Sequence, residues 1–451
     1  MEKMNWLKLL NPNRLGQSTN TNQSTARSFF EQDYDRIIFS HPFRRLQDKT
    51  QVVPLPEEDF VHTRLTHSLE VSVVGRSLGK KVGESIVAKY PELENSGFSS
   101  FDFGAIVAAA SLAHDIGNPP FGHSGEDAIS AFFKSSQLGK WIQSQVSVEE
   151  WEDLTHFEGN AQGFRLFHRP DNRGIKLTYS TLAAFSKYPR TAHLFEKDSS
   201  RKSQKKYGFF QTEKHYFEEL ANELGLIRLS NEMSWVRHPL TFLVEAADDI
   251  CYHVIDLEDG CRLGWVTFEQ ARDLLANVLG ESYLPEKLEK TKGKNEKIAY
   301  LRALCINKLI NECADVFNNN EEDILTGKFD SSLLSQIPSK RVLRDIIDVS
   351  VQKIYRSHLV LETEVVGHRV LEGLLDEFLG ASIAQKGVEE SSKKDLTVFR
   401  LLPETYQELI TDTASLYEIS LICIDYISGM TDRYAINLYR KLKGISLPGM
   451  K

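Results

Sequence analysis

The stretch "FGAIVAAASLAHDIGNPPFGHSGED", Phe103 to Asp127, indicates how this chain folds. Its first half has helical apolar spacing and is rich in small alanines, so it predicts a deeply buried helix with other helices packed closely around it. Gly117 to Pro120 must end that helix, because proline lacks an amide donor and collides with the preceding turn. The chain is therefore expected to reverse direction directly after His114 and Asp115.

A second helix is predicted immediately after this reversal. Ser124 is a good N-cap and Asp127 follows three residues later, as in a capping box, so the helix should start at about Gly125 with His123 just outside it. His123 and Glu126 then lie at a helix N-terminus, where exposed amides and the helix dipole favour an anion such as phosphate. The alternative is that these two residues only cap the helix.

Helical patterns account for most of the remaining chain. Strand patterns are rare, and the segment 226–235 could form a small hairpin at most, so the predicted fold class is all-α. Loops are predicted at 197–208, 317–323 and 386–395. Helices are predicted at 69–86, 177–186, 216–224, 239–257, 268–279, 296–317, 342–355, 362–379, 406–427 and 434–442.

The composition is that of an ordinary globular protein rather than a membrane protein. Hydrophobic residues make up 41% and charged residues 26% of the 451 positions, and the apolar run at 6–10 is much shorter than the roughly 20 residues of a membrane span. The 5 cysteines are scattered and never spaced as CxxC, which indicates free thiols in a reducing compartment. We therefore expect a cytoplasmic protein without membrane contact. The net charge of -9 provides no global basic field for nucleic acid.

His114 and Asp115 are the first candidate metal ligands. Adjacent residues on a helix point about 100° apart, so both reach one ion only near a helix end, and further ligands must come from elsewhere. His67 in "FVHTRLTHSLEV" is one candidate, and "FLVEAADDICYHVIDLEDG" offers Asp248 and Asp249 in a segment apolar enough to be buried. Buried carboxylates are costly without a partner, so a cation is expected here.

Asp248 is preferred over Asp249 as the ligand from this segment. Asp248, Tyr252 and Asp256 recur every four residues, so they share one helix face and line one side of a pocket, whereas Asp249 is out of phase with them. The alternative interpretation is that these histidines and acids form buried hydrogen-bond networks without a metal.

The pattern of His67, His114–Asp115 and Asp248 resembles the H…HD…D metal signature of the HD phosphohydrolase superfamily. Longer segments are similar to deoxyguanosine triphosphate triphosphohydrolases, and they follow in the same order from His41 to Leu442. Extended matches in register are a far more specific signal than the bare signature, although 280–403 carries no such motif. The segments are "HPFRRLQDKTQV", "HTRLTHSLEV", "AHDIGNPPFGHSGED", "FEGNAQGFR", "EAADDICYHVIDLEDG" and "GMTDRYAINLYRKL".

The resemblance implies both a fold and a reaction. The expected fold is an HD-domain catalytic core over residues 29–280, with a C-terminal helical region at 281–451 packed on it. The polar, Asn/Ser/Thr-rich start makes 1–28 a flexible N-terminal segment in this scheme. The expected reaction is hydrolysis of dGTP to deoxyguanosine and inorganic tripolyphosphate, by attack of water at the α-phosphorus.

One divalent metal ion per active site is implied as the cofactor. Its expected ligands are His67, His114, Asp115 and Asp248. The ion would polarise an α-phosphate oxygen and lower the pKa of a bound water. Mn²⁺ or Mg²⁺ is expected, and Fe²⁺, Co²⁺ and Zn²⁺ stay open, because mixed nitrogen and oxygen ligands favour the transition metals over Mg²⁺.

His123 is the predicted proton carrier, and Glu126 lies three residues away to orient it and raise its basicity. The proton passes either from water to His123 or from His123 to the 5′-oxygen. The resemblance implies that Tyr252 stacks on the deoxyribose where a 2′-hydroxyl would collide, and that Asp256 and Gln51 bind the 3′-hydroxyl. Phosphate contacts are expected from Arg64, Asn160 and Lys187.

The sequence also leads to expectations about binding partners and about alternative functions. The resemblance implies a homo-oligomer, a hexamer built from dimers, and leaves open single-stranded DNA or a nucleotide as effector. The basic run Arg201–Lys206 is expected to be a solvated loop, or else a lid or single-stranded DNA contact. The alternative functions are a broad dNTP triphosphohydrolase, another HD phosphodiesterase, and a nucleic-acid-binding module that keeps the metal site as a relic.

Overall fold

The computed structural model describes residues 2–15, 27–52, 60–168, 174–230, 232–387 and 392–446. Within these ranges the chain forms α-helices and short 3-10 turns, with isolated β-bridges and no strand, so the all-α fold class is confirmed. The predicted hairpin is reduced to a bridge between Arg228 and Trp235, beside a backbone bond of 2.8 Å from the amide of Val236 to the carbonyl of Ile227. No helix in the described ranges is long and apolar enough to cross a membrane.

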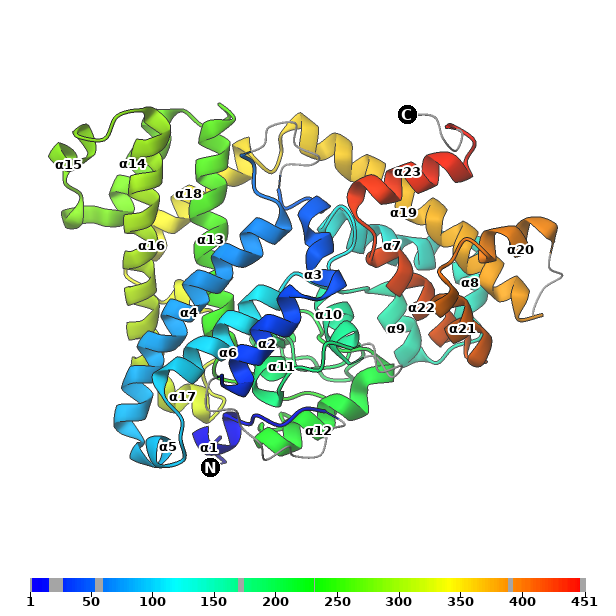
Figure 1. Ribbon diagram of the computed structural model, residues 1–451, viewed down its shortest axis with the longest axis horizontal. Helices are drawn as coiled ribbons and strands as arrows, with labels where there is room; N and C mark the ends of the chain where they lie inside the picture. Colours follow the sequence, from blue (N-terminus) through cyan, green and yellow to red (C-terminus); the bar gives the residue numbers. More distant parts are fainter. Residues whose placement is uncertain are drawn as a thin grey trace.

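The first apolar core surrounds the alanine-rich helix α6, as predicted. All residues from Ile106 to Ala113 are buried. Gly75, Gly79 and Gly83 recur every four residues on the neighbouring helix α4 and face α6, and a Cβ on Gly79 would lie only 2.6 Å from the carbonyl oxygen of Phe103. Small residues on both helices thus allow close packing. Figure 1 shows the helices of this group together: α4 (Arg64–Lys89), α6 (Ser100–Ala113), α13 (Thr241–Arg262) and α16 (Lys294–Asn319).

A second apolar core lies beside the first, on the side away from α16 (Figure 1). The C-terminal part of the chain contributes to both cores, because α16 and α18 (Lys340–Lys353) join the first and the later helices join the second. The predicted boundary at residue 280 remains a prediction. The second core is built mainly from α7 (His123–Ser135), α19 (His358–Gln385), α22 (Leu416–Ser428) and α23 (Asp432–Leu442).

The remaining helices are short or cover these two cores. They are α1 (Trp6–Leu9), α2 (Phe29–Ile38), α3 (His41–Arg45), α5 (Pro91–Asn95), α8 (Gln137–Gln143), α9 (Val148–Thr155), α10 (Gly159–Phe167), α11 (Tyr179–Phe185), α12 (Lys214–Leu224), α14 (Phe268–Leu279), α15 (Pro285–Glu289), α17 (Glu321–Leu325), α20 (Lys393–Phe399) and α21 (Glu404–Asp412). The 3-10 turns are η1 (Leu46–Asp48), η2 (Lys202–Gln204), η3 (Gln211–Glu213), η4 (Gly280–Ser282) and η5 (Leu333–Ser335).

Two predicted element boundaries in the C-terminal half are wrong. The single helix predicted at 406–427 is two helices, because Thr413 is extended and Ser415 caps α22 by accepting from the amide of Glu418. The loop predicted at 317–323 is largely helical, since α16 continues to Asn319 and α17 follows directly.

The predicted flexible segment 1–28 is wrong for residues 2–15. Trp6, Leu9 and Leu10 are buried in the first core, and the indole nitrogen of Trp6 donates to Glu321 at 2.9 Å. Burial of these apolar side chains stabilises an ordered start of the chain, although the residues that follow are polar. Residues 16–26 lie outside the described residues.

The chain reverses between α6 and α7 as predicted, but α7 starts at His123 rather than Gly125. Gly122 has φ +60°, in the left-handed region, and its carbonyl accepts from the amides of Gly125 and Glu126. Gly122 is therefore the N-cap, and the predicted capping box at Ser124 is wrong. The hydroxyl of Ser124 is instead buried without a hydrogen-bond partner.

Candidate active site

Most of the predicted site residues line one cavity of about 500 Å³ at the reversal between α6 and α7. Two do not: His67 lies buried directly behind the wall, and Asp256 lies one layer further along α13. The predicted residues on the wall are Gln51, Arg64, His114, Asp115, His123, Glu126, Asn160, Lys187, Asp248 and Tyr252.

Three candidate metal ligands come from three different helices. His67 lies in the first turn of α4, His114 follows the last residue of α6, and Asp248 lies on α13. Nε2 of His67 is 3.1 Å and Nε2 of His114 is 3.5 Å from Oδ1 of Asp248, and the three ligand atoms lie within 4.8 Å of one another. Asp248 approaches the imidazoles, whereas its neighbour Asp249 is not part of this group among the described residues.

This donor set fits a divalent metal ion. Nδ1 of His114 donates to the carbonyl of Ser111 at 2.7 Å, which leaves the Nε2 lone pair directed toward Asp248. Burial opposes ionisation of Asp248, yet its electrostatic interactions with His114 and His67 hold its pKa well below the ordinary value. Two imidazole nitrogens and one carboxylate oxygen are ligands typical of divalent transition metals.

Asp115 lies beside this three-ligand group and is already engaged by other side chains. Its Oδ2 is 3.5 Å from Nε2 of His114 and accepts from Arg64 at 2.7 Å, while its Oδ1 accepts from Asn118 at 2.5 Å. Burial would raise the pKa of Asp115, but the Arg64 charge keeps it below the ordinary value. Asp115 is therefore charged and adjacent to the cluster, and its role as fourth ligand stays a prediction.

His123 and Glu126 form a hydrogen-bonded pair at the start of α7. Nδ1 of His123 donates to Oε2 of Glu126 at 2.8 Å, and this bond raises the pKa of His123. The other oxygen of Glu126 accepts from the amide of Gly159 at 2.7 Å. Burial alone would raise the pKa of Glu126, but the His123 bond and the nearby Lys206 charge lower it. The pair therefore favours an imidazolium next to a fixed carboxylate.

One side of the cavity carries several cations. Nζ of Lys187 is 3.3 Å from the buried Glu245, whose charge raises the pKa of Lys187 although burial opposes it. Arg64 also lines the cavity, where its Nη1 donates to Asp115 at 2.7 Å. The predicted contact Asn160 donates its amide to Glu158 at 2.7 Å.

The basic run after Asp198 is part of this wall, so the solvated-loop interpretation is wrong. Lys202 pairs with Glu245 at 2.8 Å, Lys206 pairs with Glu158 at 2.9 Å, and Lys205 and Lys206 line the cavity. None of these lysines was among the predicted site residues. The basic run Arg201–Lys206 was the sequence signal that could have indicated these lysines.

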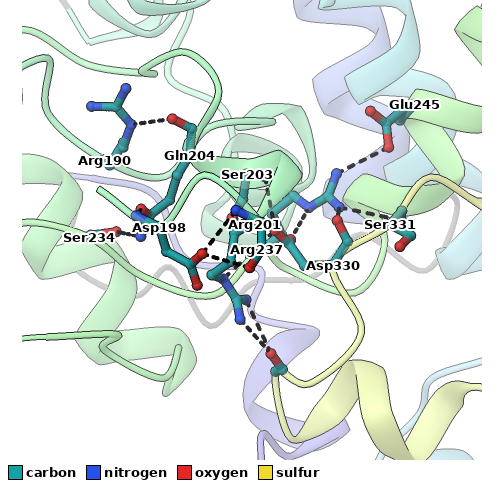
Figure 2. A network of polar contacts seen from close by, with 12 residues as sticks. Arg190, Asp198, Arg201, Ser203, Gln204, Ser234, Arg237, Glu245, Asp330 and Ser331 are labelled. Carbon is teal, nitrogen blue, oxygen red and sulfur yellow. Dashed lines mark hydrogen bonds and ion pairs between the residues drawn. The ribbon is translucent and has the colours of Figure 1, made fainter. Parts of the chain in front are cut away.

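A polar network fixes this segment in place (Figure 2). Ser203 donates to Asp330 from its amide at 3.0 Å and from its hydroxyl at 2.9 Å, and Nε of Arg237 donates to the other oxygen of Asp330 at 3.0 Å. Arg237 also donates to Glu245 on α13 at 3.1 Å. The segment 197–208 is thus joined to the helix that carries the candidate ligand Asp248.

The opposite side of the cavity is aromatic. Tyr252 stacks on Tyr355, with ring centroids 5.4 Å apart and an angle of 23° between the planes. The hydroxyl of Tyr355 donates to Asp256 at 2.8 Å, and burial raises the pKa of Asp256 well above the ordinary value. Oε1 of Gln51 is buried and has no hydrogen-bond partner in the part of the chain that the structure describes. Sequence reasoning missed Tyr355, which lies in no recognised motif.

Comparisons with known proteins show which family this chain resembles. Residues 64–172 match the HD domain, and residues 336–441 match a phosphohydrolase-associated domain. A deoxyguanosinetriphosphate triphosphohydrolase-like protein of Synechocystis sp. is 43% identical, over 98% of this chain and 100% of the relative. A protein of the same description from Pseudomonas aeruginosa is 40% identical over 99% and 100%. The deoxyguanosinetriphosphate triphosphohydrolase of Salmonella paratyphi A is 34% identical over 98% of each chain.

Proposed function

This chain belongs to the deoxyguanosinetriphosphate triphosphohydrolase family of HD-domain phosphohydrolases, and we propose that it hydrolyses dGTP to deoxyguanosine and inorganic tripolyphosphate. The observation that carries the proposal is the convergence of His67, His114 and Asp248 within 4.8 Å, beside a cavity that His114, Asp248 and His123 line. A volume of about 500 Å³ accommodates a ligand of nucleotide size.

His67, His114 and Asp248 would hold one divalent ion, with Asp115 beside them. When bound, the ion supplies Lewis-acid chemistry: it polarises a phosphoryl oxygen and lowers the pKa of a water molecule. Arg64, a cation that lines the cavity beside Asp115, would bind an α-phosphate oxygen.

The chain's own residues supply the remaining steps. Lys187 stays charged at neutral pH and neutralises the polyphosphate that leaves. His123 holds a proton because Glu126 stabilises its imidazolium, so it donates that proton to the 5′-oxygen as the bond to the α-phosphorus breaks. Gly159, through its amide, keeps Glu126 in position.

The test is product identification for each of the four dNTPs in heavy-oxygen water with Mn²⁺. We expect dGTP to give deoxyguanosine and tripolyphosphate, with the solvent oxygen in the tripolyphosphate, because water attacks phosphorus rather than C5′. Similar turnover of all four dNTPs would show that the protein is a broad dNTP triphosphohydrolase and not specific for dGTP. Release of pyrophosphate or orthophosphate, or no turnover of any dNTP, would overturn the proposal.

The pH dependence of the reaction should respond to Glu126. A Glu126→Gln change keeps the acceptor for Gly159 but removes the charge that raises the pKa of His123. Since a charged imidazolium donates the proton, activity falls as pH rises through this pKa, and the alkaline limb of the kcat profile should move to lower pH by about one unit. The matched control is Asp127→Asn, which removes a charge from the same helical turn. An unmoved limb in the Glu126 variant, or an equal movement in the control, would contradict the assignment.

Selection of deoxyribose over ribose should depend on Tyr252. Its ring is held in place by Tyr355, so it forms a rigid wall against the sugar. Replacing Tyr252 with alanine should reduce the ratio of kcat/KM for dGTP to that for GTP about 10- to 100-fold, whereas phenylalanine, which keeps the ring, should preserve it. A ratio unchanged by the alanine variant would remove Tyr252 from sugar selection.

A further inference from the structure

We propose that Asp432, at the start of the C-terminal helix α23, is a positioning residue that holds two separate segments of the active-site wall in place. The proposal rests on the proposed function, because it concerns the same reaction. Asp432 does not line the cavity, and its side chain is almost completely buried, with 1% exposed. A buried carboxylate needs several donors, and the source of those donors is informative.

The carboxylate of Asp432 accepts three hydrogen bonds from two segments that are far apart in the sequence. Its Oδ2 accepts from the amide of Thr50 at 2.9 Å and from the Thr50 hydroxyl at 2.6 Å. Its Oδ1 accepts from the amide of Phe121 at 3.0 Å. Because Asp432 is the first residue of α23, the helix N-terminus also favours its negative charge.

The bond to Phe121 supports a strained turn directly before His123. Phe121 has φ +65° and Gly122 has φ +60°, so a bulky residue occupies the left-handed region, which strains its backbone. Such a conformation persists only where its surroundings enforce it. The ring of Phe121 also packs against Gly367 of α19, where a Cβ would lie 2.9 Å away. Asp432 thus helps to set the direction in which His123 leaves the turn.

The bonds to Thr50 support the opposite wall. Thr50 directly precedes Gln51, which lines the cavity and whose side-chain oxygen is buried without a hydrogen-bond partner among the described residues. The preceding Lys49 strengthens the same junction, because its Nζ donates to the carbonyls of Asn118 at 2.5 Å and Ser428 at 2.7 Å. The C-terminal helices therefore join the segment before Gln51 to the turn before His123.

The kinetic test compares Asp432→Asn with the wild type. All three hydrogen bonds need a side-chain oxygen of residue 432 as the acceptor. Asparagine has one oxygen and one amide nitrogen that can only donate, so the backbone amide of either Thr50 or Phe121 would face that nitrogen and lose its hydrogen bond. We expect kcat for dGTP to fall about 10- to 100-fold from misplacement of His123. The matched control is Asp395→Asn, which removes a helix N-terminal carboxylate of α20. Within the described residues this carboxylate bonds only to Ser392 in its own capping box, so the change should leave kcat unchanged.

A double-mutant cycle separates positioning from general destabilisation. If Asp432 acts through His123, adding Asp432→Asn to a His123→Ala protein should lower the residual kcat by less than about threefold. The milder Thr50→Val variant removes only the hydroxyl bond, and it should raise KM about 2- to 10-fold with little change in kcat. A kcat for Asp432→Asn within about twofold of the wild type, or its full loss repeated in the His123→Ala background, would overturn the proposal.

Hydrogen exchange at the turn tests the same contact without substrate. The amide of Phe121 should exchange faster in Asp432→Asn than in the wild type and remain unchanged in Asp395→Asn. Unchanged exchange at Phe121 in the Asp432 variant overturns the proposal whether or not the protein hydrolyses dGTP. A wild type that turns over no dNTP defeats the proposed function, and the exchange result still decides whether Asp432 holds the turn.

Discussion

Replacing Asp248 with alanine is expected to lower kcat/KM for dGTP by at least about 1,000-fold, because it removes the only carboxylate of the three-ligand group. The imidazoles of His67 and His114 then remain, and they bind a divalent ion far more weakly than the complete set. The metal content of the purified variant should fall together with its activity. Steady-state kinetics and elemental analysis of the same preparation measure both quantities.

The control for this variant is Asp273→Ala, which removes an exposed carboxylate from the neighbouring helix α14. It should keep both the metal and the activity. A variant of Asp248 that loses activity but retains one metal ion per chain would show that this carboxylate is not a ligand. After a chelator has removed the metal, added Mn²⁺ should restore the activity of the wild type but not that of the Asp248 variant.

Replacing His123 with alanine is expected to lower kcat about 100- to 10,000-fold while the metal content stays at the wild-type level. The loss should appear in kcat rather than in KM, because proton transfer to the 5′-oxygen takes place only in the transition state. The alkaline limb that the His123–Glu126 pair produces should disappear from the pH profile.

His156 provides the matched control for His123. It is exposed, pairs with Glu152 at 2.9 Å and does not line the cavity, so His156→Ala should keep the wild-type kcat. A His123→Ala protein whose kcat lies within about fivefold of the wild type would exclude His123 as the proton donor.

The all-α fold and the three-ligand group of His67, His114 and Asp248 were predictable because each has a strong local signal. The alanine-rich segment before His114 could form only a buried helix, and buried acids near Asp248 required a partner. The phase of Asp248 with Tyr252 separated it from Asp249, and the same carboxylate lies 3.1 Å from His67 in the structure.

The remaining features depend on contacts between residues distant in sequence. Tyr355 reaches Asp256 from another helical region without any motif around it. Lys202 looks like part of a solvated charge run until Glu245, far along the chain, is placed beside it. The start of α7 depends on the backbone angle of Gly122 rather than on the cap-like Ser124. Oligomeric state and effectors depend on other molecules, so the predicted hexamer and DNA or nucleotide effector stay predictions.

Anomalous diffraction from crystals grown with Mn²⁺ tests the central claim most directly. We predict one manganese peak at about 2.0 to 2.3 Å from Nε2 of His67, Nε2 of His114 and a carboxylate oxygen of Asp248. A fully occupied manganese peak elsewhere in the protein, with none between these three side chains, would contradict the shared metal site and the chemistry derived from it.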